Sequence, residues 1–425
     1  MKQKASFYEP VISSTASKMD PEVFDQSIEL FGKHAYRDAL YKLLDYIDPS
    51  LRSRHGNPDG TRFTVPHGSI IVEIVLTGDD RLEITAPFVM LPEKGRIPLL
   101  RQVATLNTNV MDLACIFMQD SKLFFRYDCP MALTHPSKIY DVLWDICTTG
   151  DRYDDEFVAK FGATRIYEPR ITPYDEATVN RIYTELQQLC TECLDGVKFF
   201  EADRMYGFCW NMLSTALYQI NYFARPQGEL LNTLDKAVRE MDREDIPQSE
   251  VVARGKQAIA QLQATTREQL SESLYFVETF VSDKRRSNLA NIQSNFEDDF
   301  DNATGQLDSG NTRACAAIIL NAFYRMYYYN NLQDDVNAVV SRSLRACSAL
   351  SWEEAAPILH QAMKRIMEGE LEEETSPGGF DAQAAQAMQK AAMDQLQAAM
   401  QGVNMEEYLK NMQQMMASML GANKQ

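Results

Sequence analysis

The spacing of apolar residues changes along the chain, and each change marks a boundary between predicted regions. From residue 20, apolar side chains recur every three to four positions, which predicts helices. Two later stretches alternate apolar and polar residues around a short polar turn, which predicts two β-hairpins. The predicted elements are, in order, two helices within 20–47, a turn-rich connector over 50–68, a hairpin over 70–86, a helix over 98–107, a hairpin over 114–127, and helices over 134–147 and 151–161.

This order predicts the class of the front region. Each amphipathic layer buries only one side, so two hairpins separated by helices favour one antiparallel sheet with helices on a single face. We therefore expect an α+β domain over residues 20–168, closed by Pro169. The polar residues 1–19 before it are expected to form a flexible arm.

From Thr172 onward the pattern is helical and predicts no strand. Short links between long amphipathic helices are typical of a bundle, so residues 172–368 are expected to form an all-α body. One of its helices is predicted to run through 266–303. Four glutamates, a proline and paired glycines then mark residues 369–380 as a linker, and 381–425 as a short Met- and Gln-rich helical tail.

Charge and composition exclude several classes of partner. The net charge of −18 argues against nucleic acid and against an anionic membrane surface, since both demand basic patches. The only compact basic cluster is Lys284-Arg285-Arg286, which we place on an exposed helix face. No apolar run approaches the ~20 residues that cross a bilayer, and the first residues lack the apolar core of a secretory signal. Eight scattered cysteines suit reduced thiols, so a cytoplasmic protein is expected.

No residue pattern predicts a catalytic, cofactor or metal site. Cys190 and Cys193 form a CxxC, but a redox pair needs a helix N-terminus and these two lie mid-helix on an apolar stripe. We therefore interpret them as core residues. The acidic stretch 297–310 fails the EF-hand pattern, because in a loop that starts at Asp299 the fifth, sixth and twelfth positions hold Ala303, Thr304 and Gly310 instead of an acid or amide, a glycine and a glutamate. An enzyme with wholly non-local catalytic residues is the third hypothesis.

Two segments are candidates for protein binding. Tyr327 and Tyr328 belong to an aromatic helical segment that is either bundle core with a half-buried rim or an interface hot spot. The tail holds eight of the twenty methionines within the last 38 residues. One helical face of the tail carries Leu409, Met412, Met416 and Met419. Such a flexible apolar face either binds varied partners or docks on the protein itself or a second copy.

Residues 69–161 resemble the type III secretion chaperone-like fold, in its YbjN-like branch. The likeness lies in the first hairpin, Arg96-Ile97-Pro98-Leu99-Leu100, Phe124-Phe125-Arg126-Tyr127-Asp128-Cys129-Pro130-Met131 and Tyr153-Asp154-Asp155-Glu156-Phe157. The resemblance implies a non-enzymatic, often dimeric, cytoplasmic domain that binds protein segments. The leading hypothesis is thus a chaperone-like or adaptor protein that binds other polypeptides, with a homodimer as one expectation. The alternative is a structural subunit of a multiprotein assembly, with the helical body as its scaffold.

Overall fold

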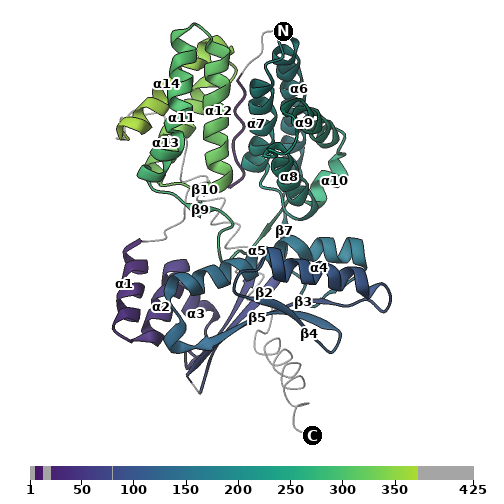
Figure 1. The fold of residues 1–425 in the computed structure, drawn as a ribbon, viewed down its shortest axis with the longest axis vertical. Coiled ribbons are helices and arrows are strands. Elements are labelled where there is room, and N and C mark those ends of the chain that lie inside the picture. The colour runs from purple at the N-terminus through teal and green to yellow at the C-terminus, as the bar shows by residue number, and fades with distance from the viewer. Residues whose placement is uncertain (1–4, 13–20, 79, 372–425) are drawn as a thin grey trace. The chain divides into compact units, whose positions relative to one another are not determined.

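The computed structural model describes residues 5–12, 21–78 and 80–371. All of them belong to one compact unit. An antiparallel sheet with helices comes first and a many-helix body follows, which confirms the predicted fold class for this part of the chain (Figure 1). The predicted linker from residue 372 and the Met-rich tail lie outside the described residues.

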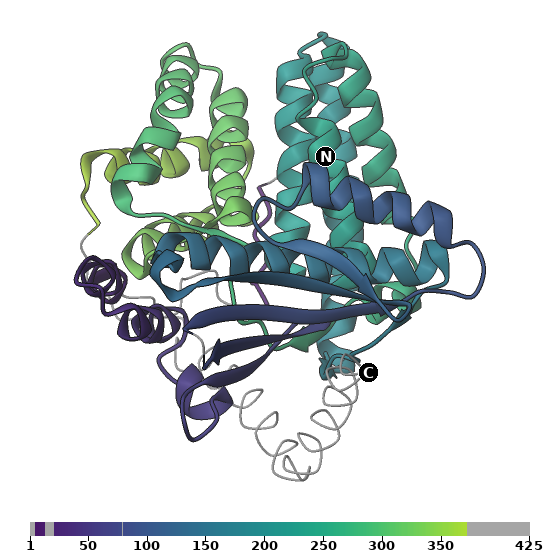
Figure 2. The same ribbon diagram turned by 60° about the horizontal axis from the view of Figure 1, so that its bottom comes forward.

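The front region alternates helices with the strands of one sheet. Its strand order is β1-β2-β3-β5-β4, all neighbours are antiparallel, and β6 pairs with the end of β3. Figure 2 shows helices α4 and α5 along one face of this sheet. The elements are α1 (Pro21–Gly32), α2 (Tyr36–Ile47), α3 (Leu51–His55), β1 (Arg62–His67), β2 (Ile70–Thr77), β3 (Arg81–Met90), α4 (Arg96–Asn109), β4 (Cys115–Gln119), β5 (Lys122–Pro130), the 3-10 turn η1 (Met131–Leu133), α5 (Pro136–Phe161) and β6 (Thr164–Arg165).

Two differences from the sequence prediction have local causes. The expected connector over 50–68 contains α3 and the edge strand β1, in which Pro66 is tolerated because an edge strand needs no second hydrogen-bonding partner. The two helices predicted around residue 150 are one helix, α5. Gly150 lets this helix cross closely over β2, since a Cβ there would lie 2.7 Å from the Ile70 side chain.

The body is helical, with short extended pieces between some of its helices. We predicted no strand after Thr172, and this was wrong: β7 pairs with β8 and β9 pairs with β10. The elements are β7 (Ile171–Pro173), α6 (Glu176–Ala202), α7 (Tyr206–Ala224), α8 (Gly228–Met241), α9 (Gln248–Gln263), α10 (Arg267–Glu272), β8 (Tyr275–Val277), β9 (Arg285–Arg286), α11 (Leu289–Asp308), α12 (Thr312–Tyr329), β10 (Asn330–Asn331), α13 (Asp334–Cys347) and α14 (Trp352–Glu368). None of the helices in the described residues is long and apolar enough for a bilayer span.

The predicted helix over 266–303 is interrupted between α10 and α11, because its middle packs on the front region. Phe280 and Val281 belong to the core cluster of the front sheet. Their backbone N–H groups donate to Nδ1 of the buried His67, at 2.9 and 3.3 Å. Lys284, which we placed on an exposed helix face, is buried just beyond this segment. The boundary at residue 168 stays a prediction, and the front core extends past it to residues 280–281.

The N-terminal residues were also predicted wrongly in part. Residues 5–12, which we expected to be a flexible arm, pack into the core of the helical body. Ala5 and Tyr8 are buried there, and Figure 1 shows this segment as a purple strip between α7 and α12. Burial of its apolar side chains holds the segment in place despite its lack of regular secondary structure.

Candidate protein-binding surfaces

The structure places the two predicted tyrosines in the body rather than on a free surface. Tyr327 is fully buried, and its hydroxyl donates to Oδ1 of Asn337 at 2.8 Å. The Tyr328 hydroxyl donates to Oδ1 of Asp235 at 2.5 Å. A fully buried ring offers no area to a partner, so the interface interpretation is corrected for Tyr327. Leu409, Met412, Met416 and Met419 lie outside the described residues.

The CxxC pair is part of the body core. Cys190 and Cys193 are both buried on α6 within the apolar cluster. Burial raises the pKa of Cys190 to about 12 and raises the pKa of Cys193 as well. A thiol held protonated at neutral pH is a poor nucleophile and a poor metal ligand. The core interpretation of this pair is thus supported by its environment.

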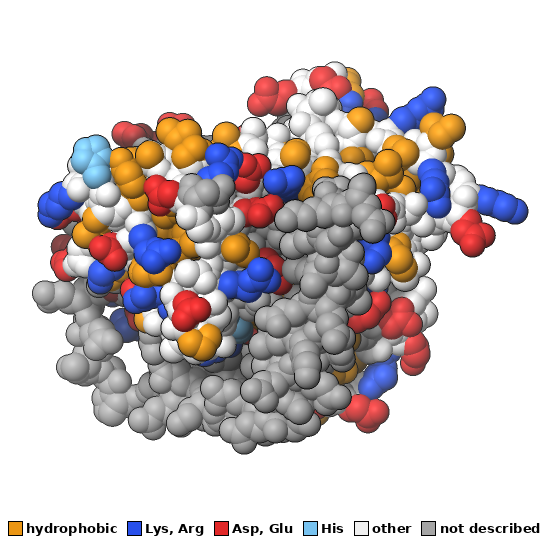
Figure 3. All heavy atoms as spheres, turned by 90° about the horizontal axis from the view of Figure 1, so that it is seen from below, with side chains coloured by type: hydrophobic (Ala, Val, Ile, Leu, Met, Phe, Trp, Pro, Cys, Tyr) orange, Lys and Arg blue, Asp and Glu red, His pale blue; other side chains and the backbone are white. Residues whose placement is uncertain are grey.

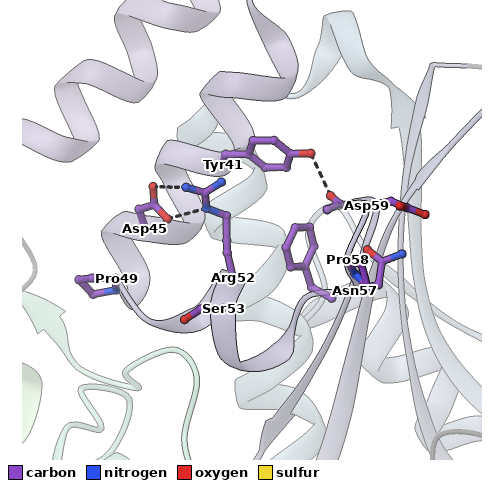
Figure 4. Close-up of a pocket in the computed structure, with 10 residues that line it drawn as sticks. Tyr41, Asp45, Pro49, Arg52, Ser53, Asn57, Pro58 and Asp59 are labelled. Carbon is purple, nitrogen blue, oxygen red and sulfur yellow. Dashed lines mark hydrogen bonds and ion pairs between the residues drawn. The ribbon is translucent and has the colours of Figure 1, made fainter. Parts of the chain in front are cut away.

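A pocket of about 470 Å³ lies where α2, α3 and the turn before β1 meet (Figure 4). Its polar groups bind one another. The Arg52 guanidinium donates to both Asp45 carboxylate oxygens, at 2.7 and 3.0 Å, and lies over the Tyr41 ring. The Tyr41 hydroxyl donates to the Gly60 carbonyl at 2.9 Å. These contacts hold α2, α3 and the turn before β1 together. Because the polar groups named here already bind one another, they are not available to a ligand.

Exposed apolar side chains gather around α4. Of the twelve large apolar residues exposed in the described part of the chain, six lie on α4, on the segments flanking it or on the adjacent face of α5. Ile97 and Met118 are the most exposed of the twelve, at 66% and 56%. The five of these residues on the helix-covered side of the sheet, which with Lys94, Arg96 and Arg101 we call the α4–β4 surface, are Ile97, Val110, Leu113, Met118 and Trp144. The sixth, Met90, pairs with Lys122 on the opposite face of the sheet.

Hydrogen bonds at both ends fix α4 beside β4. In the first turn of α4, the Arg96 guanidinium lies 3.4 Å from the Ser121 hydroxyl in the β4–β5 turn. At the other end, the Asn107 side chain binds the backbone of Ile116. Ile97 on α4 and Met118 on β4 lie between these two hydrogen-bonded positions along their elements. Their positions are therefore set by the fold, and no rearrangement is needed to present them.

The cations on this surface are free of carboxylate partners. Among the described residues, no Asp or Glu forms an ion pair with Lys94, Arg96 or Arg101, and the nearest acid in the sequence is Glu93. Figure 3 shows hydrophobic, basic and acidic side chains together on the right of the view, the side on which α4 and β4 lie in Figure 1. Three cations without a carboxylate partner thus lie among exposed apolar residues toward the start of α4, whereas Asp112, Asp141 and Asp145 lie close together near its other end.

At each edge of the sheet, an asparagine binds backbone atoms that point away from the sheet. On β4 the Asn107 carboxamide donates to the Ile116 carbonyl at 2.8 Å and accepts its N–H at 2.7 Å. On β1 the Asn57 side chain accepts the Arg62 N–H at 2.9 Å, while the Asn57 N–H donates to the Arg62 carbonyl at 2.9 Å. Such groups satisfy the outward backbone atoms that another strand would use. A partner of this region must therefore be recognised mainly through side chains.

Sequence reasoning missed the α4–β4 surface, although one signal was present. Ile97 is apolar but lies off the buried stripe formed by Leu99, Val103 and Leu106. The chain matches no known family model, and no curated protein is similar enough to count as a relative.

Proposed function

We propose that the protein is a chaperone-like or adaptor protein of the cytoplasm that binds other polypeptides through the α4–β4 surface. The observation that carries the proposal is the concentration of five of the twelve exposed large apolar residues of the described chain around one helix. The partner is an acidic segment that carries apolar side chains. The resemblance of residues 69–161 to chaperone-like domains supports the same function.

The energetics favour a partner of this chemistry. Fully covering a large apolar side chain contributes about 1.5–3 kcal/mol, so covering the partly exposed Ile97 and Met118 contributes on the order of 2–4 kcal/mol to binding. The three cations of this surface, Lys94, Arg96 and Arg101, supply attraction for carboxylates, which increases the association rate and selects against basic partners. Exposed charges are screened by salt, so the affinity should fall as ionic strength rises.

The test uses three labelled peptides, acidic, neutral and basic, with equal length and equal leucine and phenylalanine content. Fluorescence anisotropy should show the acidic peptide binding tightest, with an affinity that decreases in high salt. Ile97→Glu and Arg101→Glu should each weaken this binding about tenfold or more. Leu133→Glu is the matched control, because Leu133 is 55% exposed in the same region but lies on η1, outside this surface.

Two results would refute the proposal. One is equal binding of all three peptides, which would mean that charge plays no part. The other is an equal effect of Ile97→Glu and Leu133→Glu, which would mean that the α4–β4 surface is not the site.

A further inference from the structure

The helical body holds residues 5–12, which we call the arm segment, as an extended peptide between two groups of helices (Figure 1). On one side lie α6 and α7, and on the other lie α13 and the loop from α13 to α14. The segment lies outside every helix and strand, and it binds elements that are far away in the sequence. It therefore has the geometry of a bound peptide.

Much of the binding is made through the main chain of the segment. The Ala5 N–H donates to the Leu350 carbonyl at 3.0 Å, and the Ala5 carbonyl accepts from the Ala349 N–H at 2.9 Å. Farther along, the Val11 N–H donates to the Phe223 carbonyl at 3.1 Å. Main-chain hydrogen bonds of this kind do not depend on the side chains of the bound segment. The groove can hold other extended segments in the same way.

Side chains of the segment add selectivity. The Arg345 guanidinium donates to both carboxylate oxygens of Glu9, at 2.6 and 3.0 Å, and lies 5.5 Å from the centre of the Phe7 ring. Arg–carboxylate pairs of this two-bond geometry are directional and strong. The Tyr8 ring packs 5.2 Å from the Phe223 ring. Together these contacts select two aromatic residues followed by a carboxylate.

One feature of the arm segment fits its groove poorly. The Tyr8 hydroxyl is buried; no described group of the surrounding helices binds it, and only the Ser6 side chain of the segment itself comes near. Burying a hydroxyl without a partner is unfavourable, so phenylalanine would be bound more tightly at this position. The chain's own segment is therefore not the best ligand for the site.

From these contacts we propose that the groove is a binding site for an extended segment of another polypeptide. The ligand carries an aromatic residue, then phenylalanine, then glutamate, and it displaces the arm segment. This inference does not depend on the α4–β4 surface, and its failure would leave the proposed function standing.

The test cuts the arm segment free in the folded protein, because deleting it exposes core residues and risks unfolding. A protease site is introduced within residues 13–20, and the purified full chain is cleaved. A labelled peptide of residues 3–12 with Tyr8→Phe is then added. It should replace the cut segment and bind about tenfold tighter than the unchanged peptide. The same peptide with Glu9→Ala should bind much more weakly, as should the Phe peptide to an Arg345→Ala protein.

Three outcomes would overturn the inference. The first is no uptake of either peptide over days, which would make the segment a fixed packing element. The second is equal uptake of the Glu9→Ala peptide. The third is a concentration-dependent dimer of the uncut chain without peptide uptake, which would assign the groove to a second copy of this protein.

Discussion

Replacing Lys284 by methionine should stabilise the protein at neutral and acidic pH. Lys284 is 5% exposed, and its Nζ donates to the carbonyl of Tyr327 in the last turn of α12 at 2.5 Å. Burial, together with the nearby Arg225 charge, lowers the pKa of Lys284 from 10.5 to about 7, although Asp283 acts in the opposite direction. The side chain is an ammonium in the unfolded chain up to pH 10.5. Folding at neutral pH therefore requires burial of a charge or loss of a proton.

The size of the effect follows from the pKa. One pKa unit corresponds to about 1.4 kcal/mol, so lowering the pKa from 10.5 to about 7 costs about 5 kcal/mol of folding free energy below pH 7. Removing the ammonium leaves the Tyr327 carbonyl without this donor, which costs about 1–3 kcal/mol. The net gain in Lys284→Met should be about 2–4 kcal/mol. Between pH 7 and 10.5 only the unfolded chain binds this proton, so the gain decreases as pH rises.

Urea unfolding, followed by the fluorescence of Trp210 and Trp352 in the body, measures this difference from pH 6 to 10. Other groups titrate in the same range, and subtracting the wild-type curve removes their contribution. Lys236→Met is the control for the substitution itself, because Lys236 is exposed on α8. The reasoning fails if Lys284→Met is less stable than wild type at pH 6, or if its difference from wild type does not change with pH.

Four further changes should have distinct effects. Gly68→Ala should destabilise by about 2–4 kcal/mol in urea, because φ is +51° and a Cβ would lie 1.9 Å from a carboxylate oxygen. Gly95→Ala, with φ of +76° and open space, should cost only about 1 kcal/mol of backbone strain. Alanine at both Cys190 and Cys193 should lower the thermal midpoint by loss of core packing, and any loss of peptide binding without that drop would contradict a structural role. Deleting residues 376–425 should leave the midpoint unchanged, because the described residues up to 371 already form two core clusters. The deletion should also weaken capture of an unfolded client. A sharp drop in midpoint with unchanged capture would make the tail a packing element.

The front sheet was predictable because its strands alternate cleanly. Leu82, Ile84 and Ala86 all face the core, as their period of two requires. The break in the predicted helix 266–303 was not predictable in the same way. Leu274 and Val281 keep helical spacing, but they enter different cores. Local periodicity predicts that a residue is buried, but it does not predict in which core the residue lies.

The candidate surfaces were harder to predict, because each depends on contacts between distant residues. The Asn107 carboxamide binds the backbone of Ile116, nine residues later on the edge strand β4. Nothing in the sequence predicts this contact. The apolar residues of the arm segment show no helical or strand periodicity. Its signal was the adjacent pair Phe7 and Tyr8 within a polar stretch, which favours burial over solvent.

The two surfaces recognise polypeptide in physically different ways. At the front sheet, asparagines occupy the outward backbone atoms of Arg62 and Ile116, so a partner there must be held by apolar contact and by exposed cations. In the body groove, backbone atoms of Leu350 and Phe223 are the binding groups, and the charged contact through Arg345 is half-buried. Exposed charges are screened by salt far more than buried ones. A partner bound at the front sheet should therefore lose affinity in high salt. A partner bound in the groove should instead lose affinity when the main-chain N–H of the residue that replaces Val11 is methylated.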